Sequence, residues 1–182
     1  MEILKQNEKQ AEQHAVFTVL MGRRRVGKTS LVIKALEGCQ FAYLFVAKDS
    51  EAMLCHKFQQ TLQEQLGIQV YGRLSHFRDV FEVIMRESVH RHFSIVFDEF
   101  QNFYKVNPAI FSEMQDIWDR YHRDSHINLI TMGSIRSLMK RIFEDRNEPL
   151  YGRPTSKFTL LPFSINVLKQ IFGDHHPHYN NE

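Results

Sequence analysis

The residues from Gly22 to Thr29, GRRRVGKT, combine the residue types and the spacing that phosphate binding requires. Four residues separate Gly22 from Gly27, and Lys28 and Thr29 follow directly. The glycines allow backbone N–H groups to turn inward around a polyphosphate. The Lys28 amine can reach the β- and γ-phosphates, and the Thr29 hydroxyl can bind Mg²⁺. The stretch therefore predicts a P-loop.

The segments on either side of this stretch have the character that a P-loop needs. Residues 16–21 are apolar and predict a buried strand, and residues 29–36 predict a helix whose N-terminus favours an anion. The three arginines of the loop could contact phosphate or nucleic acid, or be solvated charges at its tip. The predicted nucleotide-binding residues are Gly22, Arg23, Arg24, Arg25, Val26, Gly27, Lys28, Thr29 and Ser30.

Two adjacent carboxylates form a second candidate group. Residues 93–97 predict a buried strand, and Asp98 and Glu99 follow it at once. Ligands of open α/β sheets bind at the carboxyl ends of the strands. Asp98 is therefore predicted to hold Mg²⁺ together with Thr29, directly or through water, and Glu99 to polarise an attacking water. The alternative interpretation is a solvated acidic loop after a core strand.

Two isolated polar residues are candidates for the same chemistry. Ser134 follows the predicted strand at 127–132, and it could touch the γ-phosphate or the water, cap the next helix, or do both. Arg153 could act as an arginine finger in its own chain or towards another one, or be a surface charge. The predicted catalytic residues are Lys28, Glu99, Ser134 and Arg153.

The order of the predicted elements indicates the fold class. The predicted strands lie at residues 16–21, 41–46, 93–97, 127–132 and 157–161. The predicted helices lie at residues 2–14, 29–36, 50–66, from 75 onward, and at 109–122, 134–144 and 164–172. Strands that alternate with helices favour a parallel α/β sheet, in which the run 41–46 is expected to be buried on both faces. Residues 68–73 are compatible with a strand or a loop.

Composition bounds the class of protein. The 182 residues are 43% hydrophobic and 24% charged with a net charge of +2, which is typical of a folded domain and gives no bulk charge for nucleic acid or membrane binding. No apolar run approaches the roughly 18 residues of a membrane span. Cys39 and Cys55 form no metal-type cluster and, with no secretory signal, predict a reduced, cytoplasmic protein.

Missing motifs narrow the nucleotide chemistry. No Asn-Lys-x-Asp follows the apolar strands, which argues against a guanine-specific GTPase. A carboxylate directly beside Asp98 favours an AAA+-type arrangement over a recombinase-type one.

The tail histidines could hold a metal, but they lack a carboxylate or cysteine at ligand spacing. We therefore predict one domain at residues 1–173 and a disordered polar tail at residues 174–182.

Four motifs, GRRRVGKTSL, IVFDEFQ, LITMGS and PLYGRPTSKFTLLPF, together resemble the archaeal-type ATPase family, a branch of the STAND-like, AAA+-related P-loop NTPases. The resemblance covers residues 16–163. It implies a three-layer ASCE core with five parallel strands in the order 5-1-4-3-2, and ATP and Mg²⁺ as ligands. By motif position it implies the following roles: Walker A for Lys28 and Thr29, Walker B for Asp98 and Glu99, a sensor-like residue for Ser134, and the Gly-Arg loop for Arg153.

The chain departs from the family pattern at both ends. Family members usually carry a segment ahead of the first helix that contributes to the adenine pocket, and they continue into a helical lid and a winged-helix domain. This chain begins at Met1 and stops at Glu182. We therefore expect an ATPase core truncated at both ends, with weak nucleotide affinity and slow turnover by itself.

These observations predict a module that binds and hydrolyses ATP with Mg²⁺ and acts as a regulatory switch for attached domains that contact DNA or a protein effector, with oligomers possible. One alternative is a non-hydrolysing ATP-binding scaffold or protein-interaction module. Another is a DNA-loading AAA+-type ATPase, whose local support is a basic helix face made by Arg136, Lys140 and Arg141. A small-molecule kinase is disfavoured, because no acceptor-binding segment or arginine-rich lid is visible.

Overall fold

The computed structural model describes residues 1–162 of the chain. Five parallel strands form one sheet in the order β2-β3-β4-β1-β5. Read from the other edge, this is the predicted order 5-1-4-3-2, which is confirmed. The strands are β1 (Val16–Met21), β2 (Phe41–Phe45), β3 (Phe93–Asp98), β4 (Ile127–Gly133) and β5 (Ser156–Thr159).

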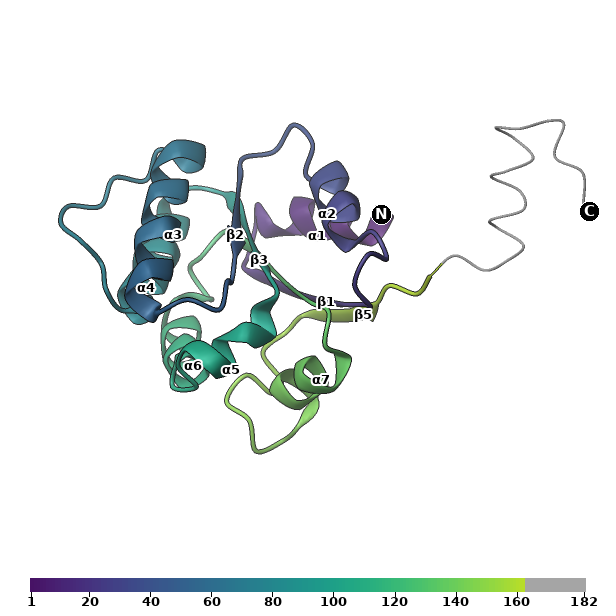
Figure 1. Ribbon diagram of the computed structural model, residues 1–182. Helices are drawn as coiled ribbons and strands as arrows, with labels where there is room; N and C mark the ends of the chain where they lie inside the picture. The colour runs from purple at the N-terminus through teal and green to yellow at the C-terminus, as the bar shows by residue number, and fades with distance from the viewer. Residues whose placement is uncertain (163–182) are drawn as a thin grey trace, which may run out of the picture.

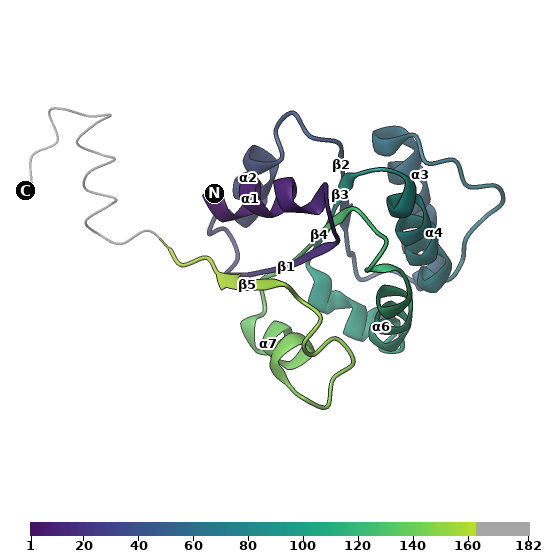
Figure 2. The ribbon, with the colours of Figure 1, turned by 180° about the vertical axis from the view of Figure 1, so that it is seen from behind.

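Helices cover both faces of the sheet and make three layers (Figure 1). They are α1 (Glu2–Ala11), α2 (Lys28–Ala35), α3 (Glu51–Leu66), α4 (Phe77–His90), the short 3-10 helix η1 (Phe100–Asn102), α5 (Phe103–Val106), α6 (Ile110–Tyr121) and α7 (Arg136–Glu144). Helices α1 and α2 lie on one face, and α6 and α7 lie on the other, as the view from behind also shows (Figure 2). In the part of the chain that the structure describes, no helix combines the length and the apolar character of a membrane span.

The alternation of side chains along each strand creates two hydrophobic cores. On β1, Phe17 and Val19 point into a large core under α3, α4, α6 and α7, whereas Leu20 points into a smaller core under α1 and α2. Strands β1, β3 and β4 are buried along their whole length because helices cover both of their faces. The cores therefore fix the carboxyl ends of these strands rigidly in space.

The burial of strand β2 differs from the prediction. As the predicted strand order implies, β2 lies at an edge of the sheet, where it pairs with β3. Ala42 and Leu44 are buried, but Tyr43 is half-buried and the Phe45 side chain is 52% exposed. The prediction that residues 41–46 are buried on both faces is therefore wrong. The unpaired edge is partly blocked, because the Tyr43 N–H donates to Gln65 Oε1 of α3 at 3.0 Å.

The segments between the strands agree with some predictions and differ from others. Helix α3 begins after Ser50, whose hydroxyl accepts from the Met53 N–H at 3.4 Å, and it ends at Gly67 with φ of 64°. Residues 68–73 form no strand. The stretch after Glu99, for which no helix was predicted, contains η1 and α5, and it buries Phe100 and Phe103 completely. The predicted helix at 164–172 and the polar tail lie outside the described residues.

Helix α1 is attached to the sheet by a buried carboxylate. Glu8 is 7% exposed, and it accepts hydrogen bonds from His92, Ser94 and Asn128 at the amino ends of β3 and β4. The His92 Nδ1 lies 2.7 Å from the His126 carbonyl oxygen. Since a carbonyl and a carboxylate can only accept, both ring nitrogens of His92 donate and the ring is cationic.

The same contacts explain how the two groups titrate. Burial by itself would raise the pKa of Glu8, but the hydrogen bonds from His92, Ser94 and Asn128 outweigh it, so the pKa lies below its usual value. The hydrogen bond to Glu8 raises the pKa of His92 in spite of the opposing effect of burial. Both shifts favour the ionised forms, the Glu8 carboxylate and the His92 imidazolium.

Candidate functional site

The predicted P-loop leaves the carboxyl end of β1 and leads into α2. The Gly22 N–H donates to the Gly133 carbonyl at 3.2 Å, which joins the start of the loop to the end of β4. A Cβ on Gly22 would lie 2.8 Å from the Leu160 carbonyl oxygen, so only glycine fits there. Gly27 and Arg25 both have positive φ, 94° and 61°, and they turn the backbone into the first turn of the helix. The loop therefore depends on its glycines as predicted.

Lys28 lies inside this loop. Its side chain is 6% exposed, and its amine donates to the carbonyl oxygens of Gly22 at 2.7 Å and of Arg23 at 3.1 Å. Burial lowers the pKa of Lys28, although the nearby Asp98 and Glu99 carboxylates act in the opposite direction. The carbonyl oxygens of Gly22 and Arg23 thus hold the Lys28 amine close to both carboxylates. A negatively charged acceptor would bind the amine more strongly and could replace these neutral carbonyls.

Asp98 ends β3 directly beside the start of α2. It is 7% exposed, and its Oδ2 accepts a hydrogen bond from the Thr29 hydroxyl at 3.1 Å. The Tyr43 hydroxyl of β2 donates to the same oxygen. The other oxygen, Oδ1, accepts from the Glu99 N–H at 2.8 Å. The two residues predicted to hold Mg²⁺, Thr29 and Asp98, are therefore in contact.

Glu99 adopts a backbone conformation that is uncommon for its type. Its φ is 54°, in the left-handed region, which costs a residue other than glycine on the order of 1 kcal/mol. Its Oε2 accepts from the Ser134 hydroxyl at 2.7 Å and from Gln101 Nε2. Ser134 does not cap α7, whose N-cap residue is Ile135. The structure therefore joins Ser134 to Glu99 and leaves its predicted contact with phosphate or water as a prediction.

A small residue makes room for this network. A Cβ on Gly133 would lie 2.3 Å from Met139 Sδ and 2.5 Å from Gln101 Oε1. Gln101 is 1% exposed, and its Oε1 has no hydrogen-bond partner among the described residues. The glycine at the end of β4 thus lets Met139 of α7 and Gln101, which donates to Glu99, approach the strand closely.

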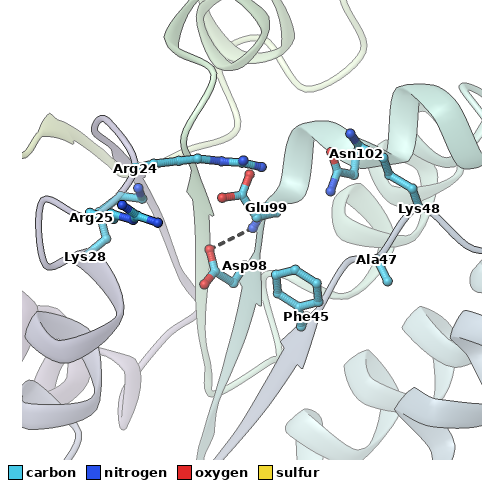
Figure 3. Close-up of a pocket in the computed structure, with 9 residues that line it drawn as sticks. All are labelled: Arg24, Arg25, Lys28, Phe45, Ala47, Lys48, Asp98, Glu99 and Asn102. Carbon is cyan, nitrogen blue, oxygen red and sulfur yellow. Dashed lines mark hydrogen bonds between the residues drawn. The ribbon is translucent and has the colours of Figure 1, made fainter.

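The loop and the carboxylates line one pocket of about 530 Å³ (Figure 3). Its lining residues are Arg24, Arg25, Lys28, Phe45, Ala47, Lys48, Asp98, Glu99 and Asn102. Figure 3 shows the Arg24 side chain extending across the pocket towards Glu99, with Phe45 and Lys48 on the β2 side. Arg23 does not line the pocket, and its predicted contact with the nucleotide stays a prediction.

Arg153 lies at the other end of the sheet. It precedes β5, whose Ser156 is paired with Thr18 near the start of β1. The guanidinium donates to both carboxylate oxygens of Asp119 on α6, at 3.3 and 2.8 Å. The structure therefore does not bring Arg153 to the P-loop of its own chain, and only a role towards another chain stays a prediction.

Sequence reasoning missed Tyr43, Gln101 and Gly133. Tyr43 stands in an apolar run, so its hydroxyl was the only signal that it could reach a polar partner. Gln101 lies two residues after Glu99, in a segment for which the sequence predicted no helix or strand. Their contacts depend on how β2, β3 and β4 are placed side by side, which no local pattern encodes.

A comparison with protein-family models matches residues 1–181 to an ATPase domain found predominantly in Archaea. The chain belongs to this family. The resemblance predicted from the four motifs is confirmed, and the chain is an ATPase domain of the nucleotide-binding P-loop NTPase class. An uncharacterized protein of Methanocaldococcus jannaschii is 28% identical over 166 residues, which are 91% of this chain and 36% of that protein.

Solved structures share the fold of this ATPase domain. The Walker-type ATPase PABY2304 of Pyrococcus abyssi has a TM-score of 0.69 at 20% identity, over 96% of this chain and 58% of that one. The ORC2 protein of Aeropyrum pernix, solved in ADPNP–ADP complexes, has a TM-score of 0.60 at 17% identity, over 97% and 50% of the two chains. Drosophila ORC bound to DNA has a TM-score of 0.66 at 14% identity, over 95% and 44%. The chain thus spans from about a third to three fifths of the length of these relatives.

Proposed function

We propose that this ATPase domain binds ATP with Mg²⁺ at the P-loop and hydrolyses it, and that its nucleotide state acts as a switch for attached domains that contact DNA or a protein effector. The observation that carries the proposal is the single pocket in which Lys28, Asp98 and Glu99 meet. A phosphate-binding amine, a metal-binding carboxylate and a water-orienting carboxylate are the groups that phosphoryl transfer to water needs.

The pocket fits a nucleotide with its metal. Four cationic and two anionic side chains line it, a balance that favours a polyphosphate. Thr29 Oγ1 and Asp98 Oδ2, 3.1 Å apart, are oxygen ligands of the kind that Mg²⁺ prefers. When bound, the metal would neutralise charge that develops on the phosphates.

The residues of the chain have separate roles in this proposal. Lys28 and the backbone of the loop bind the phosphates, while Arg24 and Arg25 add charge from the pocket wall. Glu99 orients the attacking water and takes up its proton. Ser134 acts by holding the Glu99 carboxylate at Oε2. For Arg24 and Arg25, this arrangement favours contact with phosphate over the alternative interpretation of solvated charges at the loop tip.

The DNA-loading alternative loses much of its local support. Lys140 lies 3.6 Å from a Glu144 oxygen, and Arg141 donates to Glu148 at 2.8 Å. Two of the three basic side chains on the α7 face are therefore already paired with carboxylates. A surface that binds DNA needs cations that can neutralise phosphates.

The test of the proposal is Glu99→Gln. We expect hydrolysis to fall about 100-fold or more, because a carboxamide cannot accept the proton of water, while ATP binding stays unchanged. The measurements are phosphate release and the affinity for a fluorescent ATP analogue. Glu64→Gln, on the exposed side of α3, is the matched control. Normal hydrolysis by the Glu99 variant would contradict the assignment, and binding without any hydrolysis by the wild type would favour the non-hydrolysing scaffold.

A further inference from the structure

The Tyr43 hydroxyl reaches the predicted metal carboxylate from the edge of the sheet. Tyr43 on β2 is paired with Val96 on β3, two residues before Asp98. Residues two apart on a strand point to the same face, so the Tyr43 ring lies on the face of Asp98 and can span the step between them. Its hydroxyl donates to Asp98 Oδ2, which also accepts from the Thr29 hydroxyl.

Both acceptor positions of Asp98 Oδ2 are therefore occupied. A carboxylate oxygen offers two lone pairs, and here two hydroxyl groups use them. The Thr29 oxygen has lone pairs of its own, so it can bind a cation while its O–H still donates to Asp98. Tyr43, unlike Thr29, is not a predicted metal ligand. A divalent cation that contacts Oδ2 directly is therefore expected to displace the Tyr43 hydroxyl and not that of Thr29.

The surroundings of Tyr43 leave room for such a displacement. A surface cavity of about 550 Å³ adjoins the ring and is lined by Ile33, Cys39, Gln40, Phe41, Tyr43 and Gln65. The backbone at Tyr43 is held on one side by β3 and on the other by Gln65. The side chain can thus turn towards the cavity while the strand stays in place.

We propose that Tyr43 is a positioning residue that competes with the divalent cation for Asp98 Oδ2, and so sets the Mg²⁺ concentration that nucleotide binding requires. This inference rests on the proposed function, because it assigns a regulator to the metal site of the same pocket. With low Mg²⁺, Tyr43 and Thr29 hold the carboxylate. With high Mg²⁺, the phenol leaves and the carboxylate becomes available to the metal site.

The test is Tyr43→Phe, which keeps the ring and removes the hydroxyl. The affinity for a fluorescent ADP is measured across a Mg²⁺ titration, without hydrolysis, and again with a chelator present. We expect the Mg²⁺ concentration for half-maximal enhancement to fall about tenfold, in keeping with the loss of a competing hydrogen bond to a charged group. The affinity in chelator should not change.

A matched control and a second measurement separate this role from packing. Tyr121→Phe removes a hydroxyl that lies 3.4 Å from Glu82 on α4, away from the pocket, and should leave the Mg²⁺ titration unchanged. In the wild type, Mg²⁺ added to the nucleotide complex should produce a tyrosine ultraviolet difference spectrum. That signal should be lost in Tyr43→Phe and kept in Tyr121→Phe.

The two proposals fail in different ways. If wild-type affinity for the nucleotide does not depend on Mg²⁺, the metal site is wrong and this inference falls with it. If the wild type depends on Mg²⁺ but Tyr43→Phe shows the same or a higher half-maximal concentration, the competition is refuted while the proposed function stands.

Discussion

The two ends of the sheet each hold a buried carboxylate, and they use it differently. At the amino ends of the strands, Glu8 accepts from three side chains, one of them the cationic His92, and no pocket opens onto it among the cavities that the structure describes. At the carboxyl ends, Asp98 accepts from two hydroxyl groups and borders a pocket of about 530 Å³.

The difference lies in whether the donors can be exchanged. Removing a donor from Glu8 leaves a buried charge without compensation, so that contact contributes to stability. Under the proposed function, ligands that enter the pocket would replace or supplement the hydroxyl groups on Asp98, so that contact would serve binding. A buried carboxylate thus stabilises the fold at the amino ends of the strands, whereas at the carboxyl ends it is proposed to bind a ligand.

The largest effect that this comparison predicts is on stability. Glu8→Ala should lower the free energy of unfolding by about 3 kcal/mol, because it leaves His92, Ser94 and Asn128 without their common acceptor. Urea unfolding measures this, with Glu12→Ala, an exposed position after α1, as control. Nucleotide affinity of the folded protein should not change. A loss below about 1 kcal/mol would show that α1 does not depend on this contact.

The next effect is on binding alone. Lys28→Ala should weaken ATP binding by about 2 kcal/mol or more, roughly 30-fold, because the phosphates lose a charged partner. The unfolding free energy should stay nearly constant, since the amine is held only by loop carbonyls. Lys34→Ala, exposed on the same helix, is the control for both measurements. If Lys28→Ala lowered the free energy of unfolding as much as Glu8→Ala, the proposed difference between the two ends of the sheet would be contradicted.

The smallest expected effect is a pH dependence of the free energy of unfolding, caused by the Glu8–His92 pair. The pKa of His92 is raised above 6.5, so its contribution to stability is full below pH 6.5 and disappears as the pH rises through the raised value. The pKa of Glu8 is lowered below 4.5, so its contribution is full above pH 4.5 and disappears as the pH falls through the lowered value. The pair therefore stabilises most between pH 4.5 and 6.5.

The variant His92→Gln tests this window, because it removes the charge and keeps a polar side chain. The difference in unfolding free energy between the wild type and this variant should be larger at pH 6 than at pH 8.5. A difference that is constant across this range would mean that His92 is not charged in the folded protein. Nucleotide affinity measured at both pH values should be the same for the two proteins.

The sequence predicted what depends on local pattern. The P-loop was recognisable from its glycines and from Lys28, and the strand before Asp98 from its continuous apolar run. The strand order came from the resemblance to the family, since no periodicity specifies which strands are neighbours. Contacts between strands, such as those from Tyr43 to Asp98 and from Ser134 to Glu99, could not be predicted because they depend on register.

Errors of prediction have the same origin. The aromatic residues in the run 41–46 predicted a strand buried on both faces, but Phe45 is exposed beside the pocket, because β2 lies at an edge of the sheet. The contacts of Glu8 could not be predicted, because helix periodicity does not reveal that three donors on or beside neighbouring strands surround a carboxylate. The motif around Arg153 did not reveal that the start of β5 lies at the end of the sheet opposite the P-loop, and a role of Arg153 towards another chain stays a prediction.

Gly133 has a consequence for how freely this sequence can vary. It carries no reactive group, but any larger side chain would meet Met139 and Gln101 within 2.5 Å. In a library of all single substitutions, position 133 should therefore tolerate as little change as Lys28. A map of mutational tolerance drawn on this domain would mark Gly133 as part of the candidate site, although it contributes no side chain to it and leaves space for its neighbours.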